Sequence, residues 1–248
     1  MRDCRNVITL GVHPNYSDYS PREIDLIQQA DKIYYPTGFY ADLFDAAGKQ
    51  TFPNYHTYKC VQDKIKQTAL FNLLGISHPF TRVFYGKRQK SRIAHFFDFP
   101  FVAKVPRGSA LGRGVYRIDN QAELDRYCQN DHPAYIQEYL PVDRDIRVVL
   151  VGYQVVAAYW RIAPQGDFRS NISRGGRISF DKVPPEAVQF ARDVAVKCRW
   201  DDVGIDVCMH AGRCYVLEGN MKYGRQGLRA AGIDFFRMME AFIENGVI

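Results

Sequence analysis

The sequence contains no apolar segment long enough to cross a membrane. Its longest uncharged apolar run, residues 148–160, has 13 residues and is interrupted by Gly152, whereas a membrane-spanning helix needs about 20. The first residues lead into one short apolar run and lack the pattern of a signal peptide. We therefore expect a cytoplasmic protein with no membrane partner.

Closely spaced cysteine pairs are also absent. The six cysteines are scattered and form no CxxC motif, so we expect reduced thiols. Cys208, His210 and Cys214 straddle a tight turn with no fourth partner nearby, and structural zinc takes four ligands. The sequence therefore does not indicate a zinc site.

Charge of one sign is not in large excess. The 33 Lys and Arg residues face 27 Asp and Glu residues, which gives a net charge of +6. This excess suits an anionic ligand such as a nucleotide or an acidic peptide, but it is too small to indicate a nucleic-acid partner. With 248 residues, 46% of them hydrophobic, the chain can form one multi-lobed domain or two small ones.

Hydrophobic periodicity predicts a mixed α/β protein with no internal repeat. Apolar residues at helical spacing predict helices at 21–30, 58–74, 122–128, 186–198 and 235–245. Short apolar runs predict strands at 7–12, 32–35, 81–85, 99–105, 115–118, 135–137, 147–151 and 155–161. We expect the basic stretches 87–92 and 162–178 to be irregular.

The segment 203–220 carries the most informative polar pattern. It predicts two apolar strands joined by a turn at residues 211–212, with Asp206, Glu218 and Asn220 among apolar neighbours. A hairpin loop with an odd number of residues would place Asp206 opposite Glu218, and Asn220 shares a face with Glu218. Two carboxylates and an amide oxygen suit magnesium. Ordinary surface acids on a half-exposed hairpin are the alternative.

A glycine-rich loop at residues 107–114 follows the apolar strand that contains Lys104. Its glycines let backbone amides approach a ligand closely, and Arg107 and Arg113 add positive charge. The loop lacks the Lys-Ser/Thr of a P-loop and precedes a strand, not a helix. The loop therefore predicts a flap over phosphates, and the alternative is a plain hairpin loop. Lys104 could reach the same phosphates, and the alternative is an ordinary lysine on an edge strand. Lys64, near a helix start, would by itself indicate only a surface residue.

A second group of basic residues lies downstream. Asp145 and Arg147 alternate onto one face of a strand, and Gln137–Leu140 predicts a strand that runs into an extended connector. Further on, the segment 161–177 combines arginines with three glycines; its polar members are Arg161, Asp167, Arg169, Asn171, Arg174 and Arg177. Such a density of guanidinium groups suggests an anion clamp, and a solvated basic loop is the alternative.

Taken in order, these segments resemble the ATP-grasp superfamily, and within it the RimK-type amino-acid ligases, which add glutamate to amines or carboxylates of proteins or small molecules. The resemblance covers roughly residues 60–235. Its motifs are Phe101–Lys104, the glycine loop, Gln137–Leu140, Asp145–Arg147, Gly166–Asn171, Gly204–Asp206 and Glu218–Asn220. The ordered set is far more specific than any one motif.

The resemblance implies an α/β (α+β) ATP-grasp fold, in which two α+β lobes clamp ATP. We expect a shortened amino-terminal α/β domain at 1–55, a linker helix and small lobe at 56–134, and a large lobe at 135–248. ATP and Mg²⁺ or Mn²⁺, as two ions, are the implied cofactors, with Asp206, Glu218 and Asn220 as metal ligands. The expected ATP contacts are Lys64, Lys104, Arg107, Ser109, Gly112, Gly114, Gln137, Glu138, Tyr139, Asp145, Arg147, Ser170 and Asn171.

The expected activity is that of an ATP-dependent carboxylate–amine ligase that works through an acyl phosphate. Arg169, Arg161 and Arg225 would stabilise charge on the transferring phosphoryl group. Partners would be ATP and an anionic small-molecule, peptide or protein substrate, and a homo-oligomer stays open. Residues 221–228 depart from the family's Pro-rich ending, which leaves the acceptor undefined. A non-catalytic nucleotide-binding module acting with a partner chain is the alternative.

Overall fold

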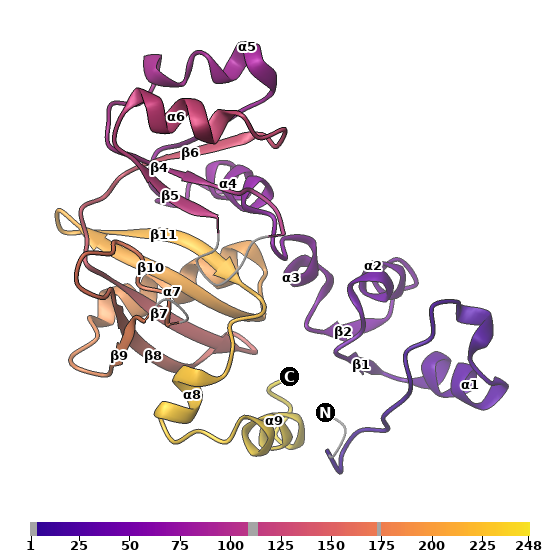
Figure 1. Cartoon of the computed structure of the whole chain (residues 1–248). Coiled ribbons are helices and arrows are strands. Elements are labelled where there is room, and N and C mark those ends of the chain that lie inside the picture. Colours follow the sequence, from indigo (N-terminus) through magenta and orange to yellow (C-terminus); the bar gives the residue numbers. More distant parts are fainter. Residues whose placement is uncertain (1–3, 109–113, 173–174) are drawn as a thin grey trace.

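The computed structural model describes residues 4–108, 114–172 and 175–248, and Figure 1 shows two sheet-containing lobes with an N-terminal unit to one side. The strands are β1 (Lys32–Tyr34), β2 (Gln50–Phe52), β3 (Thr81–Phe84), β4 (Phe101–Lys104), β5 (Val115–Ile118), β6 (Ala134–Glu138), β7 (Arg144–Val151), β8 (Gln154–Ile162), β9 (Arg177–Ser179), β10 (Asp202–His210) and β11 (Arg213–Asn220). The helices are η1 (Tyr16–Asp18), α1 (Pro21–Gln29), α2 (Gly38–Ala46), α3 (Tyr55–Lys59), α4 (Lys64–Leu73), α5 (Gly86–Lys90), η2 (Ile93–His95), α6 (Gln121–Cys128), α7 (Pro185–Cys198), α8 (Gln226–Ala230) and α9 (Phe235–Glu244).

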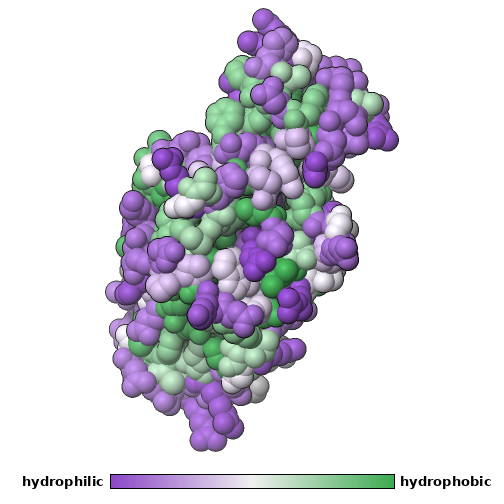
Figure 2. Space-filling model, turned by 90° about the vertical axis from the view of Figure 1, so that its left-hand side faces the viewer, coloured by the Kyte–Doolittle hydropathy of each residue, from purple (hydrophilic) through white to green (hydrophobic). Residues whose placement is uncertain are grey.

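Three sheets organise these elements. The larger sheet has the strand order β11-β10-β7-β8-β9, the smaller sheet has the order β3-β6-β4-β5, and β1 and β2 form a separate parallel pair. All pairings within the two larger sheets are antiparallel. Figure 2 shows the smaller lobe above the larger one, with polar and apolar side chains interspersed over the face in view.

Strand β7, at the centre of the larger sheet, is buried on both faces. Ile146, Val148 and Leu150 point to one face, where they share the main hydrophobic core with residues of α7, because alternate side chains of a strand point to opposite faces. Full burial of such a side chain contributes about 1.5–3 kcal/mol. Asp145 and Arg147 point to the opposite face, which therefore begins with buried charge.

Further along β7, that second face becomes apolar. Val149 packs with Tyr159 of β8 and Leu228 of α8. Val151 packs with Phe52 of the N-terminal unit and with Met239 of α9. The polar beginning of β7 thus faces a potential ligand site, while its apolar end anchors the N-terminal unit and the last helices.

The smaller sheet follows the same alternation. Phe101 and Ala103 of β4 point into a second core that also contains Leu124 of α6, and Figure 1 shows α5 and α6 on this outer side of the sheet. Val102 and Lys104 point to the other side, where they line a pocket. The period of the strand therefore brings Lys104 to the space between the two lobes.

The N-terminal unit, residues 16–59, contains the pair β1–β2 and helices α1 to α3. Helix α1 begins with a capping box, in which Ser20 and Glu23 satisfy each other's backbone amides. The unit is tied to the larger sheet by the buried carboxylate of Asp201, which accepts hydrogen bonds from the backbone amide of Asn54 and from Thr57 Oγ1. These contacts fix the unit beside the start of β10.

The expectation of one continuous helix at 58–74 is wrong, because the chain forms two helices there, α3 and α4. Gln62 adopts a φ of +53°, which an α-helix does not accommodate. Asp63 then caps α4, its side chain accepting a hydrogen bond from the amide of Lys66 at 3.0 Å. The cap also places Lys64 in the first turn of α4.

Three further expectations about local structure are wrong. Residues 7–12 form no strand; they are mostly exposed and lie outside the β1–β2 ladder. Residues 86–90 form helix α5 and not a loop. The buried ammonium of Lys90 donates to the carbonyl oxygens of Cys128 and Asn130, which fixes the end of this helix against the chain after α6. Within 162–178, the last residues pair with β8 as the start of β9. In the described parts of the chain, no helix has both the length and the apolar character to span a bilayer.

Candidate active site

A pocket lies between the two lobes and encloses about 870 Å³ of empty space, part of it open to solvent. Its lining contains apolar residues (Pro79, Val102, Val115, Leu140, Val142, Phe168, Cys208 and Leu217) and polar residues (Lys64, Lys104, Gln137, Glu138, Tyr139, Asp145, Arg161, Arg169, Ser170, Asn171, Asp206 and Glu218). Most of the site residues expected from the sequence thus meet in one place.

The hairpin β10–β11 brings Asp206 opposite Glu218. The turn has two residues, Ala211 and Gly212, both with positive φ, as in the tight turns that match strand twist. A two-residue turn alone would offset the acids, but a β-bulge at Leu217 restores their alignment. The predicted turn and the pairing of Asp206 with Glu218 are therefore both present, and the bulge, not an odd-numbered loop, produces the pairing.

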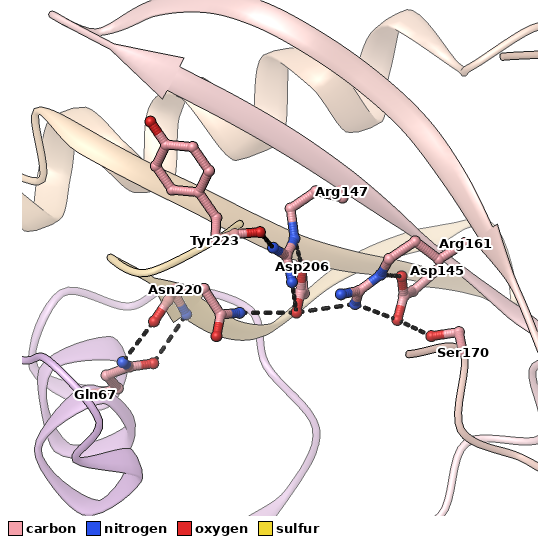
Figure 3. Close-up of polar contacts among 9 residues, drawn as sticks. Gln67, Asp145, Arg147, Arg161, Ser170, Asp206, Asn220 and Tyr223 are labelled. Atoms are coloured by element: carbon pink, nitrogen blue, oxygen red, sulfur yellow. Dashed lines mark hydrogen bonds and ion pairs between the residues drawn. The ribbon is translucent and has the colours of Figure 1, made fainter. Parts of the chain in front are cut away.

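Asp206 is the centre of a buried polar network (Figure 3). Arg147 binds its carboxylate with two guanidinium nitrogens, and Arg161 Nη2 lies 2.9 Å from Oδ2. Asn220 Nδ2 donates to the same oxygen at 2.9 Å. Burial raises the pKa of Asp206, and the two guanidinium groups oppose that shift. The carboxylate is buried but fully engaged, as a buried charge must be.

Arg161 also connects Asp206 to Asp145. Its Nε and Nη2 both donate to the Asp145 carboxylate at 2.7 Å, in the two-pronged geometry that a planar guanidinium favours. Ser170 Oγ donates to Asp145 as well, which brings the segment 167–171 against the sheet. Arg161 and Arg147, paired with Asp145 and Asp206, therefore form a floor of fixed charges beneath the pocket.

A second ionic group lies at Glu218. Lys64 Nζ is 3.3 Å from Glu218 Oε2, and Lys104 Nζ donates to Gln137 Oε1 at 2.7 Å. Burial would raise the pKa of Glu218, but Lys64 and Lys104 outweigh it and lower that pKa to about 2. Burial lowers the pKa of Lys104 to about 8, although Glu218 opposes this. Glu218 is therefore an anion and Lys104 still mainly a cation at neutral pH.

Gly219, between Glu218 and Asn220, is held from two sides. Gln67 of α4 accepts a hydrogen bond from the Gly219 amide at 2.9 Å and donates to its carbonyl oxygen at 2.8 Å. A Cβ at Gly219 would lie 2.5 Å from the Trp200 ring. Because β11 is an edge strand, the Gln67 side chain takes the place of a neighbouring strand there.

The connector after β6 forms another wall of the pocket. Glu138 is committed to Phe80, since its backbone amide donates to the Phe80 carbonyl oxygen at 2.9 Å and its carboxylate accepts from the Phe80 amide. The Tyr139 ring contacts Phe168 edge-on and lies beneath the guanidinium of Arg117. The backbone of residues 139–140 is thus supported from three directions.

Arg169 lines the pocket from the larger lobe and reaches the smaller one. Its guanidinium binds Asp167 in a paired geometry and also lies 3.4 Å from the carbonyl oxygen of Val115 in β5. Its position is therefore coupled to the relative placement of the two lobes.

Some expected site residues lie elsewhere. Arg107 Nε binds Asp63 at 3.0 Å with most of its side chain exposed, and Arg225 packs over the rings of Phe235 and Phe236 at 4.2 and 4.6 Å. The carbonyl oxygen of Gly114 accepts from the amide of Val105. Ser109 and Gly112 lie outside the described residues, as do Arg113 and Arg174.

Four residues of the site were not expected from the sequence: Gln67 and Trp200, which hold Gly219, and Phe168 and Cys208, which line the pocket. One signal was available for Gln67, because it lies three residues after Lys64 on the same helix and therefore on the same face. Nothing local distinguished Trp200 or Cys208 from ordinary core residues.

The donor chemistry of the site fits a hard divalent cation. Among the described residues no cluster of three His, Cys, Asp or Glu side chains has the arrangement of a metal site; the set here is two carboxylates and the amide of Asn220. Such oxygen donors suit Mg²⁺ or Mn²⁺. In the structure Arg147 and Arg161 occupy the oxygens of Asp206, so a cation there would exchange with guanidinium contacts.

Comparisons with known proteins agree with this architecture. The sequence profile described as a RimK-like ATP-grasp domain matches residues 61–243. A ribosomal protein bS6--L-glutamate ligase from Salmonella paratyphi B is 30% identical over 196 residues, which cover 74% of this chain. The chain spans 64% of the length of that relative.

Solved structures show the same fold at lower identity. A RimK domain ATP-grasp protein from Sphaerobacter thermophilus superposes with a TM-score of 0.62 at 17% identity, covering 83% of this chain and 75% of that one. A D-alanine--D-alanine ligase from Bacillus anthracis gives a TM-score of 0.66 at 16% identity, covering 90% of this chain and 83% of the other.

Proposed function

The chain belongs to the RimK-like ATP-grasp family, and on that premise we propose that it is an ATP-dependent ligase that joins a carboxylate to an amine. The observation that carries the proposal is the charge of the pocket and its floor. Four cations, Lys64, Lys104, Arg147 and Arg161, surround three carboxylates, Asp145, Asp206 and Glu218, and all but Glu218 are at most 9% exposed. Burying so many charges is costly unless a ligand uses them.

The proposed reaction has two steps. The substrate carboxylate attacks the terminal phosphorus of ATP, the bond to the β-phosphate oxygen breaks, and an acyl phosphate and ADP form. The amine then attacks the acyl carbon, loses a proton and expels inorganic phosphate, which leaves an amide. The protein contributes positioning and charge neutralisation, with no covalent nucleophile.

For ATP, the pocket offers an apolar slot and a cationic end. Val102, Val115 and Leu217 line the slot, and we assign the adenine edge to the backbone of residues 139–140, because Glu138 is committed to Phe80. Gln137 lies at the slot's floor, where it orients Lys104. Lys104 and Lys64 would receive the phosphates. From the resemblance we also propose the glycine loop as a phosphate contact, whereas Arg107 is not assigned one, because it is engaged with Asp63.

Arg169, Ser170 and Asn171 are assigned to the end of the pocket beside the terminal phosphate, and Arg161 to charge stabilisation there. Arg161 is oriented by Asp145, so its guanidinium is fixed before a ligand arrives, which is the arrangement that electrostatic catalysis requires. Arg225 is not assigned a catalytic role, because it is engaged with Phe235 and Phe236.

Asp206, Glu218 and Asn220 would hold Mg²⁺ or Mn²⁺, as the family pattern of two ions suggests. Bound there, the metal would neutralise phosphate charge. The chain's own residues hold the ligands in place. Gln67 fixes Gly219, and Arg147 and Arg161 keep the Asp206 carboxylate oriented until a cation exchanges with them.

Glutamate is the proposed acyl or amino component, and a peptide or protein the proposed partner, since the relative described above is named for glutamate addition to ribosomal protein bS6. A net charge of +6 favours an anionic substrate. We further propose the division into residues 1–55, 56–134 and 135–248, with the pocket between the last two.

The test is a screen of ADP release with ATP, Mg²⁺, glutamate and acidic peptides, with hydroxylamine added in parallel to trap an acyl phosphate as a hydroxamate. We expect ADP release that requires both a carboxylate and Mg²⁺, and loss of that release in Asp206→Asn. Asp193→Asn, which changes an exposed carboxylate on α7, is the matched control. ATP binding without carboxylate-dependent ADP or hydroxamate would contradict ligase activity.

A further inference from the structure

A buried carboxylate outside the pocket joins three parts of the molecule. Asp202, at the start of β10, is 4% exposed. Its Oδ2 accepts a hydrogen bond from the Tyr35 hydroxyl at 2.9 Å, and its Oδ1 accepts one from the Tyr223 hydroxyl at 2.7 Å. Tyr35 follows β1 of the N-terminal unit, whereas Tyr223 lies in residues 221–225, the loop between β11 and α8. None of the roles proposed above uses this arrangement.

The 221–225 loop is held at its centre by Tyr223. The Tyr223 carbonyl oxygen accepts a hydrogen bond from Arg147 Nη1 at 3.2 Å, and Arg147 binds Asp206 with its other nitrogens. A Cβ at Gly204 would lie 2.6 Å from the Cβ of Tyr223, so only glycine lets the loop approach β10 so closely. The loop is thus in contact with the floor of the pocket.

The contact of Asp202 with the N-terminal unit, through Tyr35, is equally specific. Tyr35 adopts a φ of +50°, a region that non-glycine residues seldom occupy, so tertiary contacts hold its ring in place. Its ring packs edge-on against Phe52. Burial raises the pKa of Asp202 to about 6, and the hydroxyls of Tyr223 and Tyr35 oppose that rise. Two neutral donors, rather than a salt bridge, therefore stabilise the carboxylate.

We propose that Tyr35, Asp202 and Tyr223 form a positioning unit, which holds the 221–225 loop and Arg147 against the active site and makes the N-terminal unit part of its support. These residues touch no reacting group, so they act through Arg147, to which the Tyr223 carbonyl oxygen is bonded. The link to turnover rests on the proposed ligase function, but the link to the loop does not.

The loop itself supplies a direct readout. Lys222 and Arg225 are exposed trypsin sites within it, and cleavage of an ordered loop requires local opening. Loss of one hydrogen bond to a buried carboxylate is expected to raise the rate of cleavage after these two residues about tenfold. Tyr35→Phe and Tyr223→Phe each delete one hydroxyl and keep the ring, so the fold is preserved.

Tyr40→Phe is the matched control. The Tyr40 hydroxyl, on α2, donates to the carbonyl oxygen of His13 at 2.9 Å, so its loss loosens the N-terminal unit without breaking a contact of Tyr35, Asp202 or Tyr223. We expect loop cleavage in this variant to equal that of the wild type. Equal cleavage in Tyr35→Phe and the wild type, or the same increase in Tyr40→Phe as in Tyr35→Phe, would overturn the proposal.

Turnover provides the second readout. We expect Tyr35→Phe and Tyr223→Phe to raise the KM for MgATP several-fold, because the unit acts through Arg147 and the Asp206 carboxylate that Arg147 holds. A uniform fall in kcat with unchanged KM in both variants would contradict the positioning role. If the wild type has no turnover, the proposed function fails, yet the trypsin comparison still decides whether the positioning unit holds the 221–225 loop.

Discussion

Replacing Gln67 with leucine removes the side chain that substitutes for a strand at the free edge of β11. The amide of Gln67 makes three hydrogen bonds, two with Gly219 and one of 3.0 Å to the carbonyl oxygen of Cys60. Each contributes about 1 kcal/mol net, and each buried backbone group left unpaired costs about 1–3 kcal/mol. Three backbone groups lose their partner at a cost of at least about 1 kcal/mol each, so we expect Gln67→Leu to lower the free energy of unfolding by at least about 3 kcal/mol.

The effect should also reach the metal ligands. Glu218 and Asn220 flank Gly219, so a loosened backbone there spreads their side chains over more orientations. We expect urea unfolding to shift to lower denaturant, and the stabilisation that Mn²⁺ gives in a thermal melt to shrink relative to the wild type. Gln189→Leu is the control: its amide donates to Asp193 on the exposed side of α7, and its loss should cost less than about 0.5 kcal/mol.

The outcome that would refute this reasoning is a Gln67→Leu protein no less stable than Gln189→Leu, with unchanged stabilisation by Mn²⁺. Gly219 would then be held by the Trp200 ring and the β10 ladder alone, and the bonds from α4 would be incidental.

Three other perturbations follow from the same contacts. Because Lys104 has a lowered pKa of about 8 and binds anions only when protonated, a non-hydrolysable ATP analogue should bind about tenfold more weakly at pH 9 than at pH 7, and Lys104→Met should abolish this pH dependence in calorimetry. Glu218 has a folded-state pKa of about 2, below its unfolded value, so its contribution to stability is present above the unfolded pKa and is lost as the pH falls. The free energy of urea unfolding should therefore decrease by about 2 kcal/mol between pH 5 and pH 3, and Glu218→Gln should lack this decrease. Gly227→Ala would place a Cβ 2.1 Å from the Tyr159 ring and should lower the midpoint of urea unfolding by an amount equivalent to about 1–3 kcal/mol.

The fold could be predicted because its signals are local and ordered. The spacing of Asp206, Glu218 and Asn220, together with the motifs at 101–104 and 137–147, indicated the ATP-grasp family, which the comparisons confirm. Strand periodicity also placed Asp145 and Arg147 together on one face of their strand. These features follow from alternation within one strand, which a sequence displays directly.

The remaining features depend on contacts between distant segments. The bulge at Leu217, which aligns Asp206 with Glu218, leaves no local trace in an apolar run. Tyr223 and Asp202 are separated by a whole hairpin, and only the folded chain brings Tyr35 to them. Arg225 was expected near the phosphates because of its charge, but the Phe235 and Phe236 rings offer it a nearer site. Residue type predicted the chemistry of the site better than the partners of each side chain.

Calorimetric titration of a non-hydrolysable ATP analogue, with and without Mg²⁺, tests the central claim most directly. The account predicts one site per chain, affinity that increases with Mg²⁺, and loss of that increase in Asp206→Asn. The variant should still unfold in one cooperative urea transition, at a lower midpoint because Arg147 and Arg161 lose a buried anionic partner. No binding to the wild-type chain, or the same dependence on Mg²⁺ in both proteins, would contradict the proposed ATP and metal site between the two lobes.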